Sequence, residues 1–221
     1  MKNGVIVINK PDGMTSHDVV IKIRSKLGVR RVGHAGTLDP LATGVLVILV
    51  GKATKLFNKF VAFDKAYRAT LILGTSTTSA DIHGKIVEQR PYQHITSQQI
   101  RETFDQFAGE IEQIPPMVSA IKMKGKKLYE LARQGIEVPR QPRKVRIDVL
   151  RIEKITIPEV TFYLECSKGT YVRQLAEDIG EKLECGACIS QIERVQVGEF
   201  KIKDAVHIEE LNESHIRHWQ S

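Results

Sequence analysis

The sequence has few cysteines, one tryptophan and no long hydrophobic run. Its three cysteines, Cys166, Cys185 and Cys188, are an odd number in a chain of 221 residues, which argues against a disulfide framework. The longest apolar run, residues 45–50, is far shorter than the roughly 20 residues that a membrane-spanning helix needs. The N-terminus also lacks a secretory cleavage pattern. We therefore expect a cytoplasmic protein that does not span a membrane.

Several motifs of cofactor and metal chemistry are missing as well. Residues 51–54 come nearest to a Walker A loop but lack its first glycine at the required spacing. Neither an HExxH helix nor a serine nucleophile elbow occurs. Cys185 and Cys188 form one CxxC pair, but no second pair or spaced histidines complete a zinc cage. Nucleoside triphosphate chemistry is therefore not indicated, and we interpret the cysteines of the CxxC pair as reduced thiols near a helix end.

Basic residues are the most abundant charged groups. The chain has 33 lysines and arginines against 26 acidic residues, a net charge of +7, and the basic ones gather in IKMKGKK and PRQPRKVR. Such clusters suit a polyanion, because each cation placed near a phosphate releases counterions. An ordinary solvated surface is the alternative that charge alone leaves open.

Hydrophobic periodicity and turn residues predict an α+β chain. We expect strands at residues 4–8, 45–50, 65–74, 118–123, 144–156 and 160–167, and helices at 15–28, 53–62, 96–109, 126–134 and 171–183. Capping boxes mark two helix starts, Thr15 with Asp18 and Thr96 with Gln99. Because the elements follow no regular βαβ period, we predict one mixed or antiparallel sheet with helices packed on it.

Residues 33–44, GHAGTLDPLATG, place one carboxylate in a glycine-rich loop before an apolar strand. Pro40 restricts the backbone of Asp39, while Gly33, Gly36 and Gly44 can take positive φ or admit the backbone of a ligand closely. A carboxylate held in this way can act as a nucleophile or a base. Asp-Pro is equally typical of a helix N-cap followed by proline, and the local pattern does not decide between the two.

The stretch GHAGTLDPLATGVL resembles the catalytic signature of the TruB family of tRNA pseudouridine synthases. Four further blocks agree in order: GVIVINKPDGMTSHD, KAYRATLILGTSTTSADIHG, QIPPMVSAIKMKGKKLYELARQG and CSKGTYVRQLAEDIGEKLECGA. The resemblance implies the pseudouridine synthase fold, a large, mostly antiparallel mixed sheet with flanking helices and a central RNA-binding cleft. We expect residues 1–221 to form a single catalytic domain with a basic, RNA-contacting insert around 110–146.

The resemblance also implies an activity and its residues. Members of the family flip a uridine (position 55) out of the T-loop of tRNA and isomerise it to pseudouridine. The matching positions are Asp39 and Arg173 as the catalytic pair, and His34, Tyr67, Tyr171 and Ile192 as substrate-binding residues. Tyr67 would stack on the base, and His34 would fill the space that the nucleotide vacates. We expect the T stem-loop of tRNA as partner, no cofactor or metal, and a monomer.

The chain departs from the family pattern near its end. Glu193 stands where the family usually has an arginine, which weakens one expected phosphate contact, and Cys188 stands where histidine is common. Many relatives continue into a small RNA-binding PUA domain, which we do not expect here because the chain ends at Ser221. RNA affinity would then come from the cleft and the basic insert.

Two other functions are compatible with parts of the sequence. A tRNA-binding folding chaperone would need binding and base flipping but no chemistry. A glycosidase would usually need two carboxylates, and the remaining candidate, Asp81, is expected to order a turn instead.

Overall fold

The computed structural model describes residues 2–119, 122–123 and 125–219. The chain divides into two compact units, residues 1–68 together with 191–221, and residues 69–190. Two strands, β4 (Lys65–Leu73) and β12 (Ala187–Val197), run from one unit into the other. The single catalytic domain stays a prediction.

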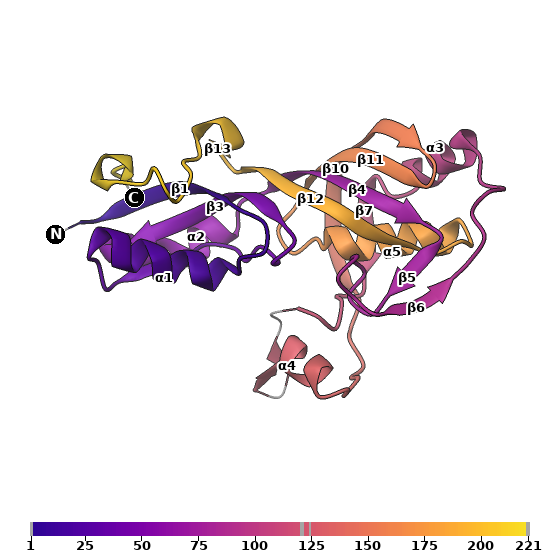
Figure 1. Cartoon of the computed structure of the whole chain (residues 1–221), viewed down its shortest axis with the longest axis horizontal. Helices are drawn as coiled ribbons and strands as arrows, with labels where there is room; N and C mark the ends of the chain where they lie inside the picture. Colours follow the sequence, from indigo (N-terminus) through magenta and orange to yellow (C-terminus); the bar gives the residue numbers. More distant parts are fainter. Residues whose placement is uncertain (1, 120–121, 124, 220–221) are drawn as a thin grey trace. The chain divides into compact units, whose positions relative to one another are not determined.

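The first unit is a small sheet with a helix on each face (Figure 1). Its elements are β1 (Gly4–Lys10), α1 (Ser16–Leu27), β2 (Val32–His34), β3 (Thr43–Val50), a 3-10 helix at Gly51–Leu56, α2 (Phe57–Val61), β13 (Phe200–Lys201) and 3-10 turns at Ile202–Asp204 and Glu213–His215. β1 and β3 pair antiparallel, with Gly4 opposite Val50 and Lys10 opposite Gly44. β12 joins β3 in the parallel sense, with Arg194 beside Gly44.

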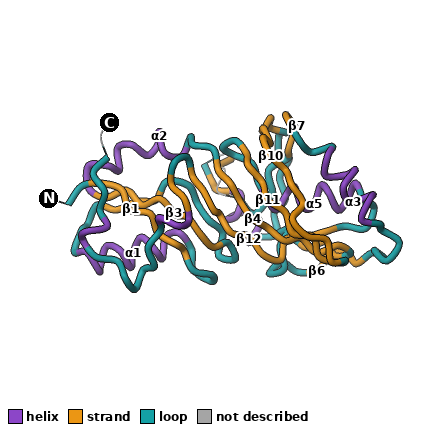
Figure 2. The backbone as a smooth tube through the Cα atoms, turned by 90° about the horizontal axis from the view of Figure 1, so that it is seen from above, coloured by secondary structure: helices purple, strands orange, loops and turns teal. Residues whose placement is uncertain are grey.

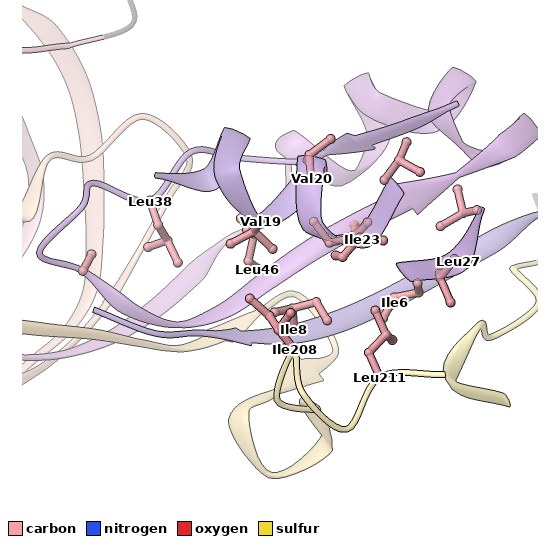
Figure 3. Close-up of a cluster of buried hydrophobic side chains, with 14 residues drawn as sticks. Ile6, Ile8, Val19, Val20, Ile23, Leu27, Leu38, Leu46, Ile208 and Leu211 are labelled. Atoms are coloured by element: carbon pink, nitrogen blue, oxygen red, sulfur yellow. The ribbon is translucent and has the colours of Figure 1, made fainter. Parts of the chain in front are cut away.

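Alternation along β1 and β3 divides the core of this unit between the two faces. Figure 2 shows α1 and α2 on opposite sides of these strands. Under α1, the cluster of Figure 3 joins Ile6 and Ile8 of β1 to Val19 and Ile23 of the helix. On the other face Phe60 of α2 contributes to an aromatic group that includes the single tryptophan. Burial of these apolar side chains stabilises the unit that carries the loop 33–44.

The second unit holds the other half of the large sheet, two small two-stranded sheets and helices of its own. Its elements are β5 (Thr75–Thr77), β6 (Ile86–Gln89), α3 (Ser97–Asp105), β7 (Gly109–Gln113), β8 (Lys122–Met123), β9 (Lys126–Lys127), α4 (Leu128–Arg133), β10 (Arg143–Thr156), β11 (Glu159–Cys166) and α5 (Val172–Lys182). β10 pairs antiparallel with both β11 and β7. Phe104 of α3 meets Phe162 of β11 edge to face, with ring centroids 5.5 Å apart.

The prediction of an α+β class with one large mixed sheet is confirmed. The nine-stranded sheet has the order β1-β3-β12-β4-β11-β10-β7, with β2 paired to β3 and β13 paired to β12. Both expected capping boxes form, at Thr15 and at Thr96. Among the described residues no helix is long and apolar enough to cross a membrane.

Several element boundaries differ from the predictions. The helix expected at 53–62 begins as a 3-10 helix, and α3 ends at Asp105 because the chain enters β7 at Gly109. Residues 126–127, expected in a helix, form β9. Of the strand expected at 118–123, only Lys122–Met123 is a strand, and residues 120–121 lie outside the described part.

Candidate functional site

The loop that carries Asp39 is a connection between β2 and β3, and no helix begins in it. The N-cap interpretation of Asp-Pro is therefore wrong. The carbonyl oxygen of Asp39 instead accepts a hydrogen bond from the nitrogen of Ala42 at 3.0 Å, which closes a tight turn into β3. Asp39 itself is half-buried.

Ser16, the first residue of α1, fixes the residue before Asp39. Its Oγ donates to the carbonyl oxygen of Leu38 at 3.0 Å and accepts from the nitrogen of Leu38 at 2.8 Å. Ser16 and Leu38 are both buried. Because one hydroxyl bonds both backbone polar groups of Leu38, the residue before Asp39 is held at two atoms.

Lys10, the last residue of β1, binds the residue after Asp39. Its fully buried Nζ donates to three carbonyl oxygens, those of Pro11 at 2.7 Å, Met14 at 2.6 Å and Pro40 at 3.1 Å. Burial lowers the pKa of Lys10 from 10.5 to about 8, although the carboxylates of Asp12 and Asp39 act in the opposite direction. A buried ammonium is tolerated here because each of its three protons has an acceptor.

Arg194 of β12 binds both ends of the same loop. Its side chain is 1% exposed, and its three nitrogens donate to three carbonyl oxygens: Nε to Val45 at 2.8 Å, Nη1 to Thr37 at 3.2 Å and Nη2 to Gly36 at 3.1 Å. A planar guanidinium can satisfy three separated acceptors in this way, whereas an ammonium cannot span them. The guanidinium thus ties residues 36–37 to residue 45.

Two glycines make this arrangement possible. Gly36 and Gly44 have φ of 99° and 98°, values that a residue with a Cβ adopts only with strain. A Cβ on Gly44 would also lie 2.9 Å from the nitrogen of Arg194 and closer still to its carbonyl oxygen. The backbone that approaches Gly44 closely is therefore that of Arg194 in the chain itself, and not that of a ligand as the sequence suggested. Gly33 lies in β2 and shows neither feature.

His34 lies at the end of β2 and is half-buried. Burial, followed by the positive charge of Arg194, lowers the pKa of His34 below its ordinary value of 6.5. Its Nδ1 is buried and has no hydrogen-bond partner among the described residues. The surroundings of His34 therefore favour the neutral imidazole at pH 7.

The other two candidates of the first unit lie on neighbouring strands. Tyr67 of β4 is 8% exposed. Ile192 of β12 is half-buried and packs against the cluster that contains Leu38 and Leu46. Both side chains contribute apolar surface in the unit that holds Asp39.

Arg173 and Tyr171 lie in the second unit, at the start of α5. Tyr171 is the N-cap residue, and the buried amide of Gln113 bonds its backbone twice, through Nε2 to the carbonyl oxygen at 3.1 Å and through Oε1 from the nitrogen at 2.8 Å. Arg173 is only 4% exposed. Arg173 is therefore a buried residue at the start of α5 and not a surface arginine.

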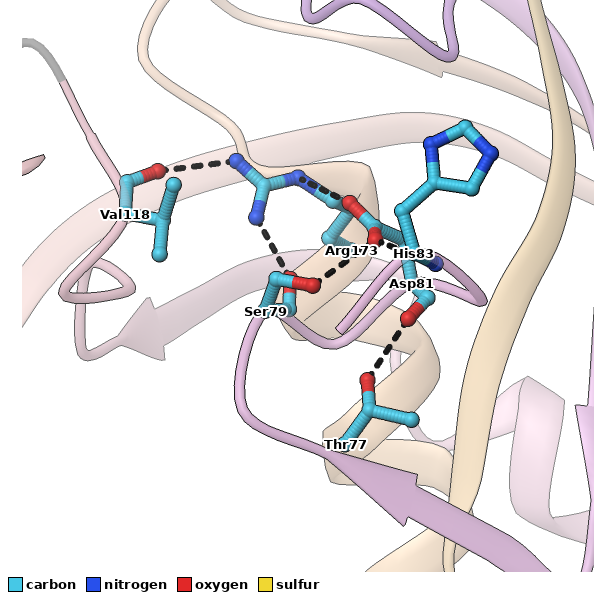
Figure 4. A network of polar contacts seen from close by, with 6 residues as sticks. All are labelled: Thr77, Ser79, Asp81, His83, Val118 and Arg173. Carbon is cyan, nitrogen blue, oxygen red and sulfur yellow. Dashed lines mark hydrogen bonds and ion pairs between the residues drawn. The ribbon is translucent and has the colours of Figure 1, made fainter. Parts of the chain in front are cut away.

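The guanidinium of Arg173 belongs to a buried polar network (Figure 4). It donates to the carbonyl oxygens of Ser79 and Val118, the latter at 2.8 Å, and its Nε lies 3.8 Å from Oδ2 of Asp81. Oδ1 of Asp81 accepts from Ser79 Oγ at 2.7 Å and from the nitrogen of His83 at 3.1 Å. The expectation that Asp81 orders a turn is confirmed, and its ion pair with Arg173 is an addition.

Four side chains that hold these backbones were not among the predicted site residues. They are Lys10, Ser16, Gln113 and Arg194. Local patterns placed Lys10 just after the strand expected at 4–8 and Ser16 at a helix start, and gave no sign that their polar atoms reach residues 38 and 40. Arg194 follows Glu193 in the sequence, and no periodicity indicates an arginine buried within a strand.

The three cysteines are buried and carry free thiols. Burial raises the pKa of Cys188 to about 11, with the charge of Asp81 as a smaller cause acting in the same direction. Such a thiol is protonated and unreactive near neutral pH.

Comparisons with known proteins assign the chain to a family. Residues 24–172 match the sequence model described as TruB family pseudouridylate synthase (N terminal domain), and residues 173–220 match the tRNA pseudouridylate synthase B C-terminal domain. The chain is 51% identical over 211 residues to tRNA pseudouridine synthase B of Alkaliphilus oremlandii, covering 95% of this chain and 70% of that protein. It is 46% identical to the protein of the same name from Endomicrobium trichonymphae, covering 95% and 91%.

A solved structure agrees with these matches. The crystal structure of a Cbf5-Nop10-Gar1 complex contains a chain with a TM-score of 0.75 and 29% identity, and the match covers 95% of this chain and 54% of that one. This structural likeness confirms the fold expected from the sequence. The chain belongs to the TruB family of pseudouridylate synthases.

Proposed function

We propose that the chain isomerises a uridine of the tRNA T-loop, at position 55, to pseudouridine, with Asp39 as the catalytic carboxylate. The observation that carries this proposal is the fixed backbone around Asp39. The residue before it is bonded at both backbone atoms by Ser16, and the residue after it is bonded by Lys10. A reacting group held this rigidly lowers the barrier by avoiding reorientation during the reaction.

The proposed chemistry requires no external reactant. The N1–C1′ bond of uridine breaks, the base turns, and C1′ is joined to C5; the proton that leaves C5 is balanced by the one gained at N1. The carboxylate of Asp39 can add to the sugar or the base, or can take a proton from the sugar. No electron acceptor enters this balance, in keeping with the expectation that no cofactor is used.

The remaining assignments extend the family resemblance. Arg173 is assigned as the cation that favours the ionised form of Asp39. Tyr67 is assigned to stack on the flipped base, a contact worth roughly 1 to 3 kcal/mol per base. Tyr171 and Ile192 are assigned as further walls of the base pocket, and His34 as the residue that fills the gap left in the T-loop. The T stem-loop of tRNA is the proposed partner.

The test compares two carboxylate variants. Incubation of the chain with a tRNA transcript labelled with tritium at C5 of uridine should release tritium from one T-loop position. Asp39→Asn should lower the rate by at least about 10²-fold while tRNA binding stays within about twofold. Asp12→Asn is the matched control, because Asp12 is an exposed carboxylate of the turn that follows Lys10, and it should react normally.

Two outcomes would contradict the proposal. A normal rate in Asp39→Asn would remove Asp39 from the chemistry. A wild-type chain that refolds tRNA without releasing tritium would favour the chaperone alternative instead.

A further inference from the structure

Arg194 is the buried group through which β12 acts on the loop of Asp39. Its guanidinium bonds the carbonyl oxygens of Gly36 and Thr37 on one side of Asp39 and that of Val45 on the other. One side chain therefore closes residues 36–45 into a ring that contains Asp39. Closing a segment of this length removes much of its freedom to move.

The backbone of Arg194 strengthens the same connection. Arg194 pairs with Gly44 in the parallel register of β12 and β3, and the missing Cβ of Gly44 lets the two backbones approach. Arg194 therefore contacts both the start and the end of the loop, through its backbone at Gly44 and through its side chain at Gly36, Thr37 and Val45. A displacement of Arg194 is thereby transmitted to both ends at once.

The middle of the loop is held by residues of other elements. Ser16 of α1 bonds Leu38, and Lys10 of β1 bonds Pro40. These contacts do not involve Arg194, so they stay in place when it is replaced. Loss of the Arg194 contacts is therefore expected to shift Asp39 slightly rather than to unfold the loop.

We propose that Arg194 is a positioning residue for the reaction: it fixes the carboxylate of Asp39 through the backbone of residues 36–45 without touching the RNA. The inference rests on the proposed function of Asp39. With 1% of its surface exposed and each of its three nitrogens bonded to a carbonyl oxygen of residues 36–45, Arg194 is buried against the chain's own backbone and not directed at a bound phosphate. Its effect is therefore on the chemical step and not on tRNA affinity.

The test measures the chemical step and tRNA binding separately, in the whole chain carrying Arg194→Lys or Arg194→Gln. Lysine keeps the charge and glutamine keeps an N–H donor, but neither reproduces a fork that reaches three carbonyl oxygens. Each variant is assayed for single-turnover pseudouridine formation with enzyme in excess, for tRNA affinity by filter binding, and for folding by the fluorescence of the single tryptophan. The proposal is tested as long as one of the two Arg194 variants folds.

We expect the single-turnover rate of the folded variants to fall by about 10²-fold, the cost of misplacing a reacting group by about 1 Å. tRNA affinity should stay within about twofold. The matched control is Gln196→Met, because Gln196 lies on the same strand and bonds the carbonyl oxygen of Gly198 at 2.7 Å, away from the loop. It should keep the wild-type rate.

The outcomes distinguish this inference from the proposed function. If wild type forms pseudouridine, Asp39→Asn does not, and Arg194→Lys or Arg194→Gln reacts at the wild-type rate, only the positioning role is overturned. A parallel loss of rate and tRNA affinity would also overturn it, since that result indicates general damage. If wild type forms no pseudouridine, or Asp39→Asn reacts normally, the proposed function itself fails, whatever the Arg194 variants do.

Discussion

Gly44 and Arg194 lie backbone to backbone, so close that a Cβ on Gly44 would be 2.9 Å from the nitrogen of Arg194. The contact joins the first residues of β3 to β12. The side chain of Arg194 binds the loop that ends at Gly44. The missing Cβ of Gly44 therefore permits both the contact between the two strands and the contacts of Arg194 with the loop.

The first prediction compares Gly44→Ala with Gly36→Ala. Both positions have φ near 100°, so each variant meets the same backbone strain, of order 1 to 3 kcal/mol. At Gly36 a Cβ would lie 3.8 Å from Nη1 of Arg194, an ordinary contact. Gly44→Ala adds a backbone clash and should be the more destabilised by at least about 1 kcal/mol, as measured by urea unfolding. Equal losses would show that the close approach is relieved at little cost.

The second prediction concerns Lys10 and alkaline pH. The pKa of Lys10 is about 8 in the folded chain against 10.5 unfolded, so the unfolded chain holds more protons between these values. The free energy of unfolding contributed by Lys10 therefore rises with pH across this window. Urea unfolding at pH 7.5 and 9.5 should show this rise in wild type relative to Lys10→Met. A difference between the two proteins that is independent of pH would contradict it.

Fluorescence is a suitable probe for that measurement. Trp219 is the single tryptophan and packs on Phe60 and Phe200, with ring centroids 4.9 Å and 5.5 Å away. These residues belong to the same unit as Lys10, so the signal reports the unfolding of that unit.

The third prediction is that His34 titrates below pH 6.5 and that Arg194 contributes to this shift. Burial is the larger cause, and the charges of Arg194 and His17 act in the same direction. Arg194→Gln should therefore raise the pKa of His34, which a pH titration followed by NMR of the imidazole would detect. Gln196→Met is the control and should leave the titration unchanged. Because the folded pKa is lowered, the stability contributed by His34 falls as pH drops through this range.

The sequence was most informative where short-range rules act. The capping boxes and the turn at Asp81 depend on residues a few positions apart, and both were predicted correctly. The resemblance supplied the fold, which periodicity alone left as an unspecified mixed sheet. The ends of α3 and α4 were missed because tertiary contacts, which no local pattern contains, decide where a helix gives way to a strand.

The supports of the candidate site were the part that sequence could not supply. Arg194 is separated from Gly36 by 158 residues, and Ser16 from Leu38 by 22. Their bonds go to backbone carbonyl oxygens, which every residue possesses, so the acceptors leave no trace in the sequence. Asp39 itself was conspicuous because its glycine and proline neighbours are unusual.

The last prediction concerns the buried pair of Asp81 and Arg173 in the second unit. Asp81→Ala would remove the carboxylate beside the guanidinium of Arg173 and the acceptor of Ser79 and His83, and should lower the free energy of unfolding by roughly 3 to 5 kcal/mol. Asp81→Asn keeps an oxygen for the turn and loses only the charge, whose attraction at 3.8 Å is not reinforced by a direct hydrogen bond. It should cost about half as much. Asp105→Asn, an exposed change at the end of α3, should stay within about 0.5 kcal/mol of wild type. Urea unfolding, monitored by circular dichroism, gives the free energy of unfolding of the three variants. If Asp81→Asn lowers it as much as Asp81→Ala does, the charge of Asp81, rather than the turn it orders, stabilises the network around Arg173.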